Sequence, residues 1–319
     1  MRIFFTAGLL AAGPIAQVAA ADYPSRPLRI IVPFTAGGST DVLARMIGKN
    51  LTEAWGQPVV VDNRAGANGV IAAELIARSN PDGHSLLMIA IGHALNPSLN
   101  KKLPYDSEKD FQPVSLTAII PLLLAVHPSV KANTVQELIT LAKANSKPLS
   151  YASGGIGSSQ HLAGELINSM AGIRMIHVPY KGGAPGLVDL LAGQVNVMAT
   201  TIIALVPHSR AGRVRVLGIT TQKRSAVMPD VPTLSESGLK GYESIAWYGL
   251  VAPSGIPPVV LDKLSAAVIK GTLSKDMQDT LIKQGAEPVG NGPKEFAAFI
   301  KVETNKYARV IREAGIKAE

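Results

Sequence analysis

Short apolar segments alternate along the chain with longer segments that have a helical pattern. Continuous apolar runs occur at Leu28–Pro33, Val59–Val61 and Ser85–Ala90. Such runs are typical of parallel strands that are covered on both faces. Between them, residues 42–55 and Val70–Ala77 have the composition and spacing of helices. This alternation predicts βαβ units and therefore an α/β fold.

A second set of alternating elements begins near Pro121. Its predicted strands are Leu122–Val126, Leu149–Ala152, Met175–Val178, Val195–Met198 and Val214–Thr220. Helices are predicted between them, at Val135–Ala144 and from Ser158. Two long helices, Pro257–Thr272 and Pro293–Ala314, are predicted to follow, with prolines in their first turns, where a helix tolerates them. The length of 319 residues suits two domains of roughly 150 residues each.

Composition narrows the class of protein. Apolar residues make up 47% of the chain and charged residues 17%, which is enough to build a large core. The 31 basic and 23 acidic side chains leave a net charge of +8, but the basic residues are scattered and aromatics are 5%. A nucleic-acid groove needs clustered charge and stacking rings, so no nucleic-acid partner is expected. The lack of cysteine excludes disulfides, thiolate metal sites and cysteine nucleophiles.

The N-terminal segment predicts export. Residues 1–21 contain one early positive charge, at Arg2, followed by an apolar stretch that ends in Ala19-Ala20-Ala21. This pattern is typical of a secretory signal peptide, with cleavage near Ala21 and the neighbouring alanine as an alternative. A buried N-terminal helix is the other interpretation. We expect a periplasmic protein, because a bacterial envelope compartment suits a chain without cysteine.

Two glycine-containing turns each follow a predicted strand and open a predicted helix. They are Pro33–Asp41 and Tyr151–His161. Glycine lets a ligand approach the backbone, and the first N–H groups of the helix favour an anion. Each turn alone could be an ordinary well-capped connection. Because they lie in opposite halves of the chain, a cleft between two domains would bring them face to face.

Enzyme signatures are largely missing. The dinucleotide-binding fingerprint fails because Gln160 stands where its third glycine is required. Neither a phosphate-binding loop nor a nucleophile elbow occurs, and no two of the six histidines lie within five residues of each other. We therefore expect no catalysis, no cofactor and no metal site. The enzyme alternative is a secreted α/β hydrolase that uses Ser158 or Ser159 with His161.

Several longer motifs together resemble one known family. They are Tyr23–Asp41, Val61–Gly69, Asn80–Gly83, Val178–Gly183, Pro229–Thr233 and Trp247–Pro253. The chain resembles the Bug-type extracytoplasmic solute-binding proteins, which are the receptor components of tripartite tricarboxylate transporters. The resemblance implies a two-lobed periplasmic-binding-protein (Venus flytrap) fold, each lobe a mostly parallel sheet flanked by helices. Lobe 1 is expected to comprise residues 22–123 and 226–319, and lobe 2 residues 124–225.

The same resemblance implies a function and a site. The expected function is that of a monomeric periplasmic receptor that captures a small carboxylate and delivers it to membrane transporter subunits. A sensor that serves a signalling partner is an alternative. The carboxylate would be held by both glycine turns, largely through backbone amides and bridging waters. The implied ligand-binding residues are Phe34, Thr35, Ala36, Gly37, Gly38, Ser39, Asp41, Ser153, Gly154, Gly155, Gly157, Ser158 and His161. Among these, Asp41 is expected to hold its loop without touching the anion.

One departure from the family pattern bears on the ligand. Where relatives commonly have Asp-x-Met-Phe-Asp, this chain has Ala199 in place of the aromatic residue and Thr200 in place of the second acid. An uncharged, wider wall with Thr201 and the amide of Asn96 favours a di- or aromatic carboxylate over an amino acid. Alternatively, Thr200 only caps the following helix.

Overall fold

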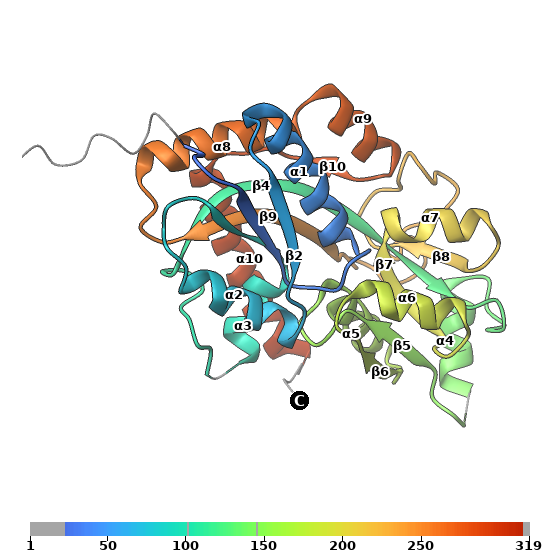
Figure 1. Cartoon of the computed structure of the whole chain (residues 1–319). Coiled ribbons are helices and arrows are strands. Elements are labelled where there is room, and N and C mark those ends of the chain that lie inside the picture. Colours follow the sequence, from blue (N-terminus) through green and yellow to red (C-terminus); the bar gives the residue numbers. More distant parts are fainter. Residues whose placement is uncertain (1–22, 101, 145, 315–319) are drawn as a thin grey trace, which may run out of the picture.

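The computed structural model describes residues 23–100, 102–144 and 146–314 of the chain. The predicted signal peptide, residues 1–21, therefore lies outside the described residues. The described residues form one curled sheet of ten strands with helices on its faces (Figure 1). Its strand order is β2-β1-β3-β9-β4-β7-β5-β6, and β8 and β10 also pair with β4. Among the described residues no helix combines the length and apolar character that a membrane crossing needs.

The N-terminal elements build lobe 1 around three parallel strands. These strands are β1 (Leu28–Val32), β2 (Val59–Asn63) and β3 (Ser85–Ala90), with β1 in the middle. The connecting helices are α1 (Ser39–Trp55), the short 3-10 turn η1 (Ala67–Gly69), α2 (Val70–Ala77) and α3 (Gly92–Leu99). Ile30 and Ile31 of β1 and Leu86 and Leu87 of β3 are buried, so the prediction of apolar strands covered on both faces is correct for β1 and β3. It is wrong for β2, because this strand lies at the edge of the sheet and its Val60 is 53% exposed.

One long strand, β4 (Phe111–Val126), connects the two lobes. Its first section pairs antiparallel with β9 (Ile245–Pro253) up to Pro121, and from Leu122 onward it pairs with strands of lobe 2. The sequence predicted only Leu122–Val126, because polar residues interrupt the apolar pattern before that point. Two of these hydroxyls bond to backbone: Ser115 Oγ donates to Asn291 O at 2.7 Å and Thr117 Oγ1 to Tyr248 O at 2.9 Å. These bonds allow polar residues in a buried strand.

Lobe 2 repeats the parallel arrangement. Its parallel strands are β5 (Ser150–Ser153), β6 (Ile176–Pro179) and β7 (Val197–Thr201), and β8 (Arg215–Ile219) pairs antiparallel with β4. Its helices are α4 (Val135–Ala144), α5 (Ser159–Ala171), α6 (Gly183–Leu191) and α7 (Ile202–Arg210). The prediction of mostly parallel sheets is thus correct for three strands in each lobe. The sheet as a whole is mixed, because β4 and β9 run antiparallel to their neighbours.

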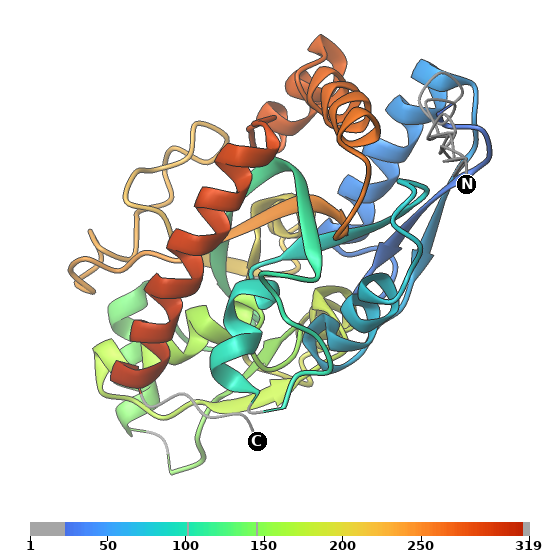
Figure 2. The same ribbon diagram turned by 90° about the vertical axis from the view of Figure 1, so that its left-hand side faces the viewer.

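The C-terminal elements pack against elements from the N-terminal part of the chain, α1, α3 and β4. The C-terminal elements themselves are α8 (Pro258–Thr272), α9 (Lys275–Lys283), β10 (Glu287–Pro288) and α10 (Pro293–Ala314). Figure 2 shows α10 lying across the face of the molecule opposite β2. Its Phe296, Tyr307 and Ile311 are buried, which confirms the apolar face that the sequence predicted for this helix.

Candidate functional site

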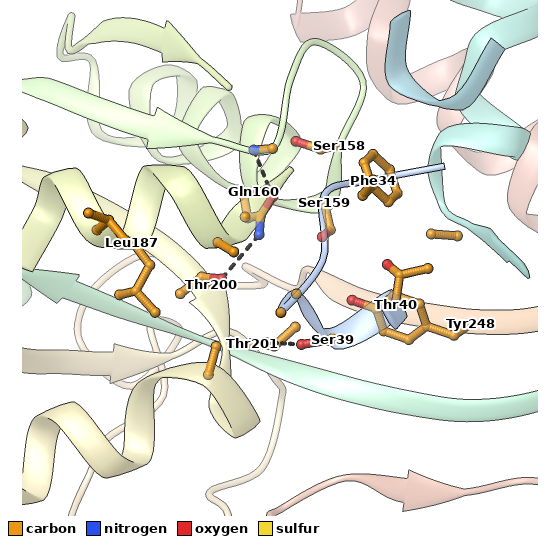
Figure 3. Close-up of a pocket in the computed structure, with 18 of the residues that line it drawn as sticks. Phe34, Ser39, Thr40, Ser158, Ser159, Gln160, Leu187, Thr200, Thr201 and Tyr248 are labelled. Atoms are coloured by element: carbon orange, nitrogen blue, oxygen red, sulfur yellow. Dashed lines mark hydrogen bonds between the residues drawn. The ribbon is translucent and has the colours of Figure 1, made fainter. Parts of the chain in front are cut away.

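A cavity of about 550 Å³ lies between the two lobes (Figure 3). Lobe 1 contributes the turn before α1, the turn between β3 and α3, and Tyr248 from β9. Lobe 2 contributes the ends of β5 and β7 and the inner faces of α6 and α7. The lining residues are Phe34, Gly37, Gly38, Ser39, Thr40, Ala90, Ile91, Gly92, Gly154, Ser158, Ser159, Gln160, Gly183, Ala184, Leu187, Val188, Leu191, Ala192, Thr200, Thr201, Ala204, His208, Arg213 and Tyr248.

In the described part of the chain, five helices direct their N-terminal ends to this cavity. Their first or capping residues on its wall are Ser39 of α1, Gly92 of α3, Ser159 of α5, Gly183 of α6 and Thr201 before α7. A helix N-terminus carries partial positive charge and unpaired N–H groups. No Asp or Glu is present among the lining residues that the structure describes. The cavity is therefore suited to an anion.

The turn before α1 leaves its amides available. Gly37 has φ +83°, and Gly38 is the N-cap in an extended conformation without a side-chain cap. The first helical bond runs from Val42 N–H to Gly38 O at 3.0 Å, so the N–H groups of residues 39–41 have no partner within the helix. An anion at this end would accept hydrogen bonds from backbone alone.

Asp41 holds this turn in place. Its Oδ2 accepts hydrogen bonds from Gly37 N–H and Arg45 Nε, both at 3.0 Å. Burial raises the pKa of Asp41, but the hydrogen bonds from Arg45, Gly37 and Asn63 and the charge of Arg45 outweigh burial and lower it below 3.8. The carboxylate is ionised and is not part of the cavity wall, which agrees with the loop-holding role expected for it.

The second glycine turn is ordered by its own helix. Ser158 Oγ accepts from the backbone N–H of His161 at 3.2 Å, and His161 Nδ1 accepts from Gly157 N–H at 3.1 Å. The ring lies 4.3 Å from the ring of His177, and burial lowers the pKa of His161 to about 4. The Ser158 hydroxyl meets the backbone N–H of His161 and not its ring, so Ser158 and His161 do not form the nucleophile–base pair that the hydrolase alternative needs.

Gln160 connects the two walls of lobe 2. Its Oε1 accepts from Gly154 N–H at 2.8 Å, and its Nε2 donates to Thr200 Oγ1 at 3.1 Å (Figure 3). A Cβ at Gly154 or Gly183 would lie within 2.6 Å of this amide group, so a side chain at either position would displace the Gln160 amide. Sequence reasoning noted Gln160 only as a missing third glycine. The sequence feature that could have pointed to its role is a polar side chain in the first turn of a helix, directly after a glycine turn.

Hydrogen bonds join the turn before α1 in lobe 1 to lobe 2 beside the cavity. Ser39 Oγ and Thr201 Oγ1 lie 2.6 Å apart, and Thr35 N–H donates to Lys181 O at 3.2 Å. Thr35 was predicted as a ligand contact, but it faces the turn before α6, where its Oγ1 would be 2.8 Å from a Cβ at Gly182.

The structure brings half of the predicted residues together. The predicted residues on the cavity wall are Phe34, Gly37, Gly38, Ser39, Gly154, Ser158, Thr200 and Thr201. The predicted residues outside that wall are Thr35, Ala36, Asp41, Asn96, Ser153, Gly155, Gly157 and His161. Asn96 and Gly155 line a second, smaller cavity of about 310 Å³ on the other side of Phe34.

Two residues of the predicted selectivity wall are placed differently from expectation. Asn96 Oδ1 accepts from Asn68 Nδ2 at 3.1 Å, so its amide serves the turn around η1. Ala199 is 3% exposed and belongs to the core instead of the cavity wall. A larger residue there would press on the core, so the absence of a ring at this position does not widen the cavity directly.

The apolar wall and one cation were not predicted. Leu187, Val188 and Leu191 of α6 line the cavity, and Arg213 stands after α7. Their apolar pattern in the sequence is that of any helix that packs on a sheet, so it did not separate cavity from core. Among the described residues no group of three or more His, Cys, Asp or Glu side chains could hold a metal ion.

The fold is that of a two-lobed binding protein with a cavity between its lobes. Residues 43–316 match the sequence pattern of the tripartite tricarboxylate transporter family receptor. The chain is 38% identical to BugT of Bordetella pertussis, over 96% of this chain and 94% of that protein. It is 37% identical to a protein encoded in the tcbD-tcbE intergenic region of Pseudomonas sp. strain P51, over 93% of this chain and 88% of that protein. The chain belongs to this receptor family and is a periplasmic solute-binding protein.

Solved structures agree with this assignment. The periplasmic binding protein BugD has 35% identity and a TM-score of 0.89, covering 92% of this chain and 99% of its own. An R. palustris protein with adipate has 36% identity and a TM-score of 0.90, covering 93% of this chain and 99% of its own. MatC of Rhodopseudomonas palustris with bound malate has 34% identity and a TM-score of 0.86, covering 91% of this chain and 100% of its own.

Proposed function

We propose that this receptor captures a small carboxylate in the cavity between its lobes and delivers it to membrane transporter subunits. The observation that carries the proposal is the convergence of five helix N-termini on a cavity without a lining acid, among the residues described. The ligand carboxylate would accept from the amides at Gly38–Thr40 and at Ser159–Gln160. Relatives solved with adipate and malate support a carboxylate as the ligand class.

The binding cycle would be a hinge motion of the two lobes. We place lobe 1 at residues 22–123 and 226–319, and lobe 2 at residues 124–225, with a monomer as the working unit. The change of partners in β4 between Pro121 and Leu122 supports a hinge there. The closed form would contain the direct Ser39–Thr201 hydrogen bond of this structure beside the bound ligand, and it would then be presented to the transporter.

The wall at Thr200 supports a preference within carboxylates. Its hydroxyl accepts from Gln160 Nε2, so its own hydrogen remains able to donate to a ligand oxygen. A ligand ammonium would find no lining carboxylate here among the described residues. We therefore infer that di- or aromatic carboxylates bind more tightly than acidic amino acids.

A binding screen tests the proposal. Purified receptor is titrated calorimetrically with mono-, di-, tri- and aromatic carboxylates, and thermal shifts are recorded in parallel. A ligand at one hundred times its dissociation constant stabilises the folded state by about 2.7 kcal/mol, which raises Tm by a few degrees. Saturable binding of one or more carboxylates is expected. Failure of every carboxylate, with a neutral or cationic solute binding instead, would overturn it.

A further inference from the structure

The cavity extends well beyond its anion-binding end. On α6 the lining residues recur on one face from Gly183 to Ala192, which spans about 14 Å at the rise of an α-helix. On α7 the lining positions Thr201, Ala204 and His208 are three and four residues apart and span about 10 Å. Both helices begin at the anion-binding end, so the cavity follows them outward to their C-terminal ends.

The middle of this length is apolar. It is lined by Leu187, Val188 and Leu191 of α6 and by Ala204 of α7. Val188 is 62% exposed, which is unusual for a large apolar side chain in a wall between two lobes. A ligand with an apolar chain or ring would cover this surface and remove it from water, which favours binding. A compact, fully polar ligand would leave it in water.

The outer end of the cavity is cationic. Arg213 lines it next to His208, and Arg213 N–H donates to His208 O at 2.9 Å, which fixes their backbones side by side. In the described part of the chain neither side chain has a hydrogen-bond or ion-pair partner, and Arg213 is exposed. The C-terminal ends of α6 and α7 carry partial negative charge. An anion would therefore be favoured here only because of the Arg213 guanidinium.

We propose that this end is a second subsite that binds the far anionic group of an elongated ligand. The ligand class is a dicarboxylate whose two carboxylates are separated by an apolar spacer, either an extended chain or a ring. One carboxylate lies at the helix N-termini, the spacer lies along Val188, and the other carboxylate pairs with Arg213. This inference rests on the proposed function, because it assumes that the first carboxylate binds at the glycine turns.

The test compares ligands with one and two charged ends. Dissociation constants are measured by calorimetry for adipate against hexanoate and for benzene-1,4-dicarboxylate against benzoate. The proteins are the parent, Arg213→Gln, Arg213→Lys and Arg210→Gln. Arg210 is also exposed and close in sequence but does not line the cavity, so it is a control with the same change of charge.

The parent is expected to bind at least one dicarboxylate more tightly than its one-ended analogue. Arg213→Gln should weaken that dicarboxylate about three- to tenfold and the analogue less than twofold, because an ion pair near solvent contributes modestly. Arg213→Lys should keep most of the affinity, and Arg210→Gln should change neither ligand. The Arg213 effect should shrink as salt is raised.

Other results separate the two proposals. If the parent binds malate but neither elongated dicarboxylate, the second subsite is wrong and the carboxylate receptor stands. The second subsite is also wrong if Arg213→Gln weakens both ligands of a pair equally, or if it weakens neither ligand. In both cases the proposal of a carboxylate receptor stands. If the folded parent binds no carboxylate at all, the proposed function fails first.

Discussion

Ser39 Oγ lies 2.6 Å from Thr201 Oγ1, and this hydrogen bond joins residues 162 positions apart in the chain. Ser39 is the first residue of α1 in lobe 1, and Thr201 is the last residue of β7 and the N-cap of α7 in lobe 2. The bond therefore exists only when the two lobes are together. Both residues also line the cavity, so closure and ligand binding involve the same hydroxyls.

Removing either hydroxyl of this pair should weaken ligand binding. Ser39→Ala and Thr201→Val are each expected to raise the dissociation constant about three- to tenfold, since one hydrogen bond contributes about 0.5–1.5 kcal/mol. The double variant should lose less than the sum of the two. Calorimetric titrations of the four proteins measure this coupling, and strictly additive losses would mean that the bond does not contribute to the bound state.

Gly38→Val should remove carboxylate binding and preserve the fold. Gly38 has φ −81°, which valine tolerates, and the nearest atom to an added Cβ is Thr35 O at 3.7 Å. The new side chain would nevertheless occupy the cavity wall beside the α1 amides. Gly155→Val is a less clean test, because Gly155 has φ +113° and would be strained.

Lys181→Ala is the matched control for this test, since Lys181 is exposed and does not line the larger cavity. We expect its affinity to stay within about threefold of the parent, because the anion is held mainly by backbone amides. If Lys181→Ala abolishes binding while Gly38→Val still binds, the ligand carboxylate is not at the α1 amides. Circular dichroism melts establish that each variant is folded.

Gln160→Glu should reduce affinity for anions at least tenfold. The new carboxylate can still accept from Gly154 N–H and can accept from the Thr200 hydroxyl, so the local hydrogen bonds survive. It also adds a negative charge beside the anion site. Gln278→Glu on α9 makes the same chemical change away from the cavity and should bind as the parent does. Equal affinities for all three proteins would place the anion elsewhere.

Thr200→Asp should change the order of ligand preference. The parent is expected to bind a dicarboxylate or aromatic carboxylate more tightly than aspartate or glutamate, since an unmatched ammonium loses about 1.5–3 kcal/mol, or roughly ten- to hundredfold. An acid at position 200 supplies that partner and repels a second carboxylate. Dissociation constants for both ligand classes, at one salt concentration, measure the ranking. An unchanged ranking would remove Thr200 from the binding site.

Mild acid should destabilise the protein through two buried histidines. Burial lowers the pKa of both His93 and His161 to about 4. For His93 the hydrogen bond to Ser107 O raises the pKa, but the effect of burial is larger. Because the ordinary value is 6.5, the unfolded chain binds more protons than the folded one between these values. The free energy of unfolding should therefore fall by a few kcal/mol from pH 6.5 to about pH 4.

Urea unfolding across this range measures the effect. His161→Gln and His93→Gln should each flatten the dependence on pH. A flat dependence in the parent would show that these imidazoles are not buried in their neutral form.

Local patterns in the sequence were enough to predict most elements of the fold. The apolar runs at β1 and β3, the amphipathic face of α10 and the two glycine turns all depend on residues close together in the chain. Their conformations follow from burial of one face and from the freedom of glycine to adopt positive φ, as at Gly37. The motifs along the chain also predicted the family correctly.

Only the tertiary structure decided which of these residues meet. The first section of β4 escaped prediction because its hydroxyls are satisfied by distant carbonyls, such as that of Tyr248 for Thr117. The place of Gln160 between Gly154 and Thr200 depends on the order of strands in lobe 2. The approach of Ser39 to Thr201, and the position of Arg213 at the outer end of the cavity, depend on how the two lobes face each other. Hydrophobic periodicity reports which face of an element is covered but not by which partner, and the site is made of those partners.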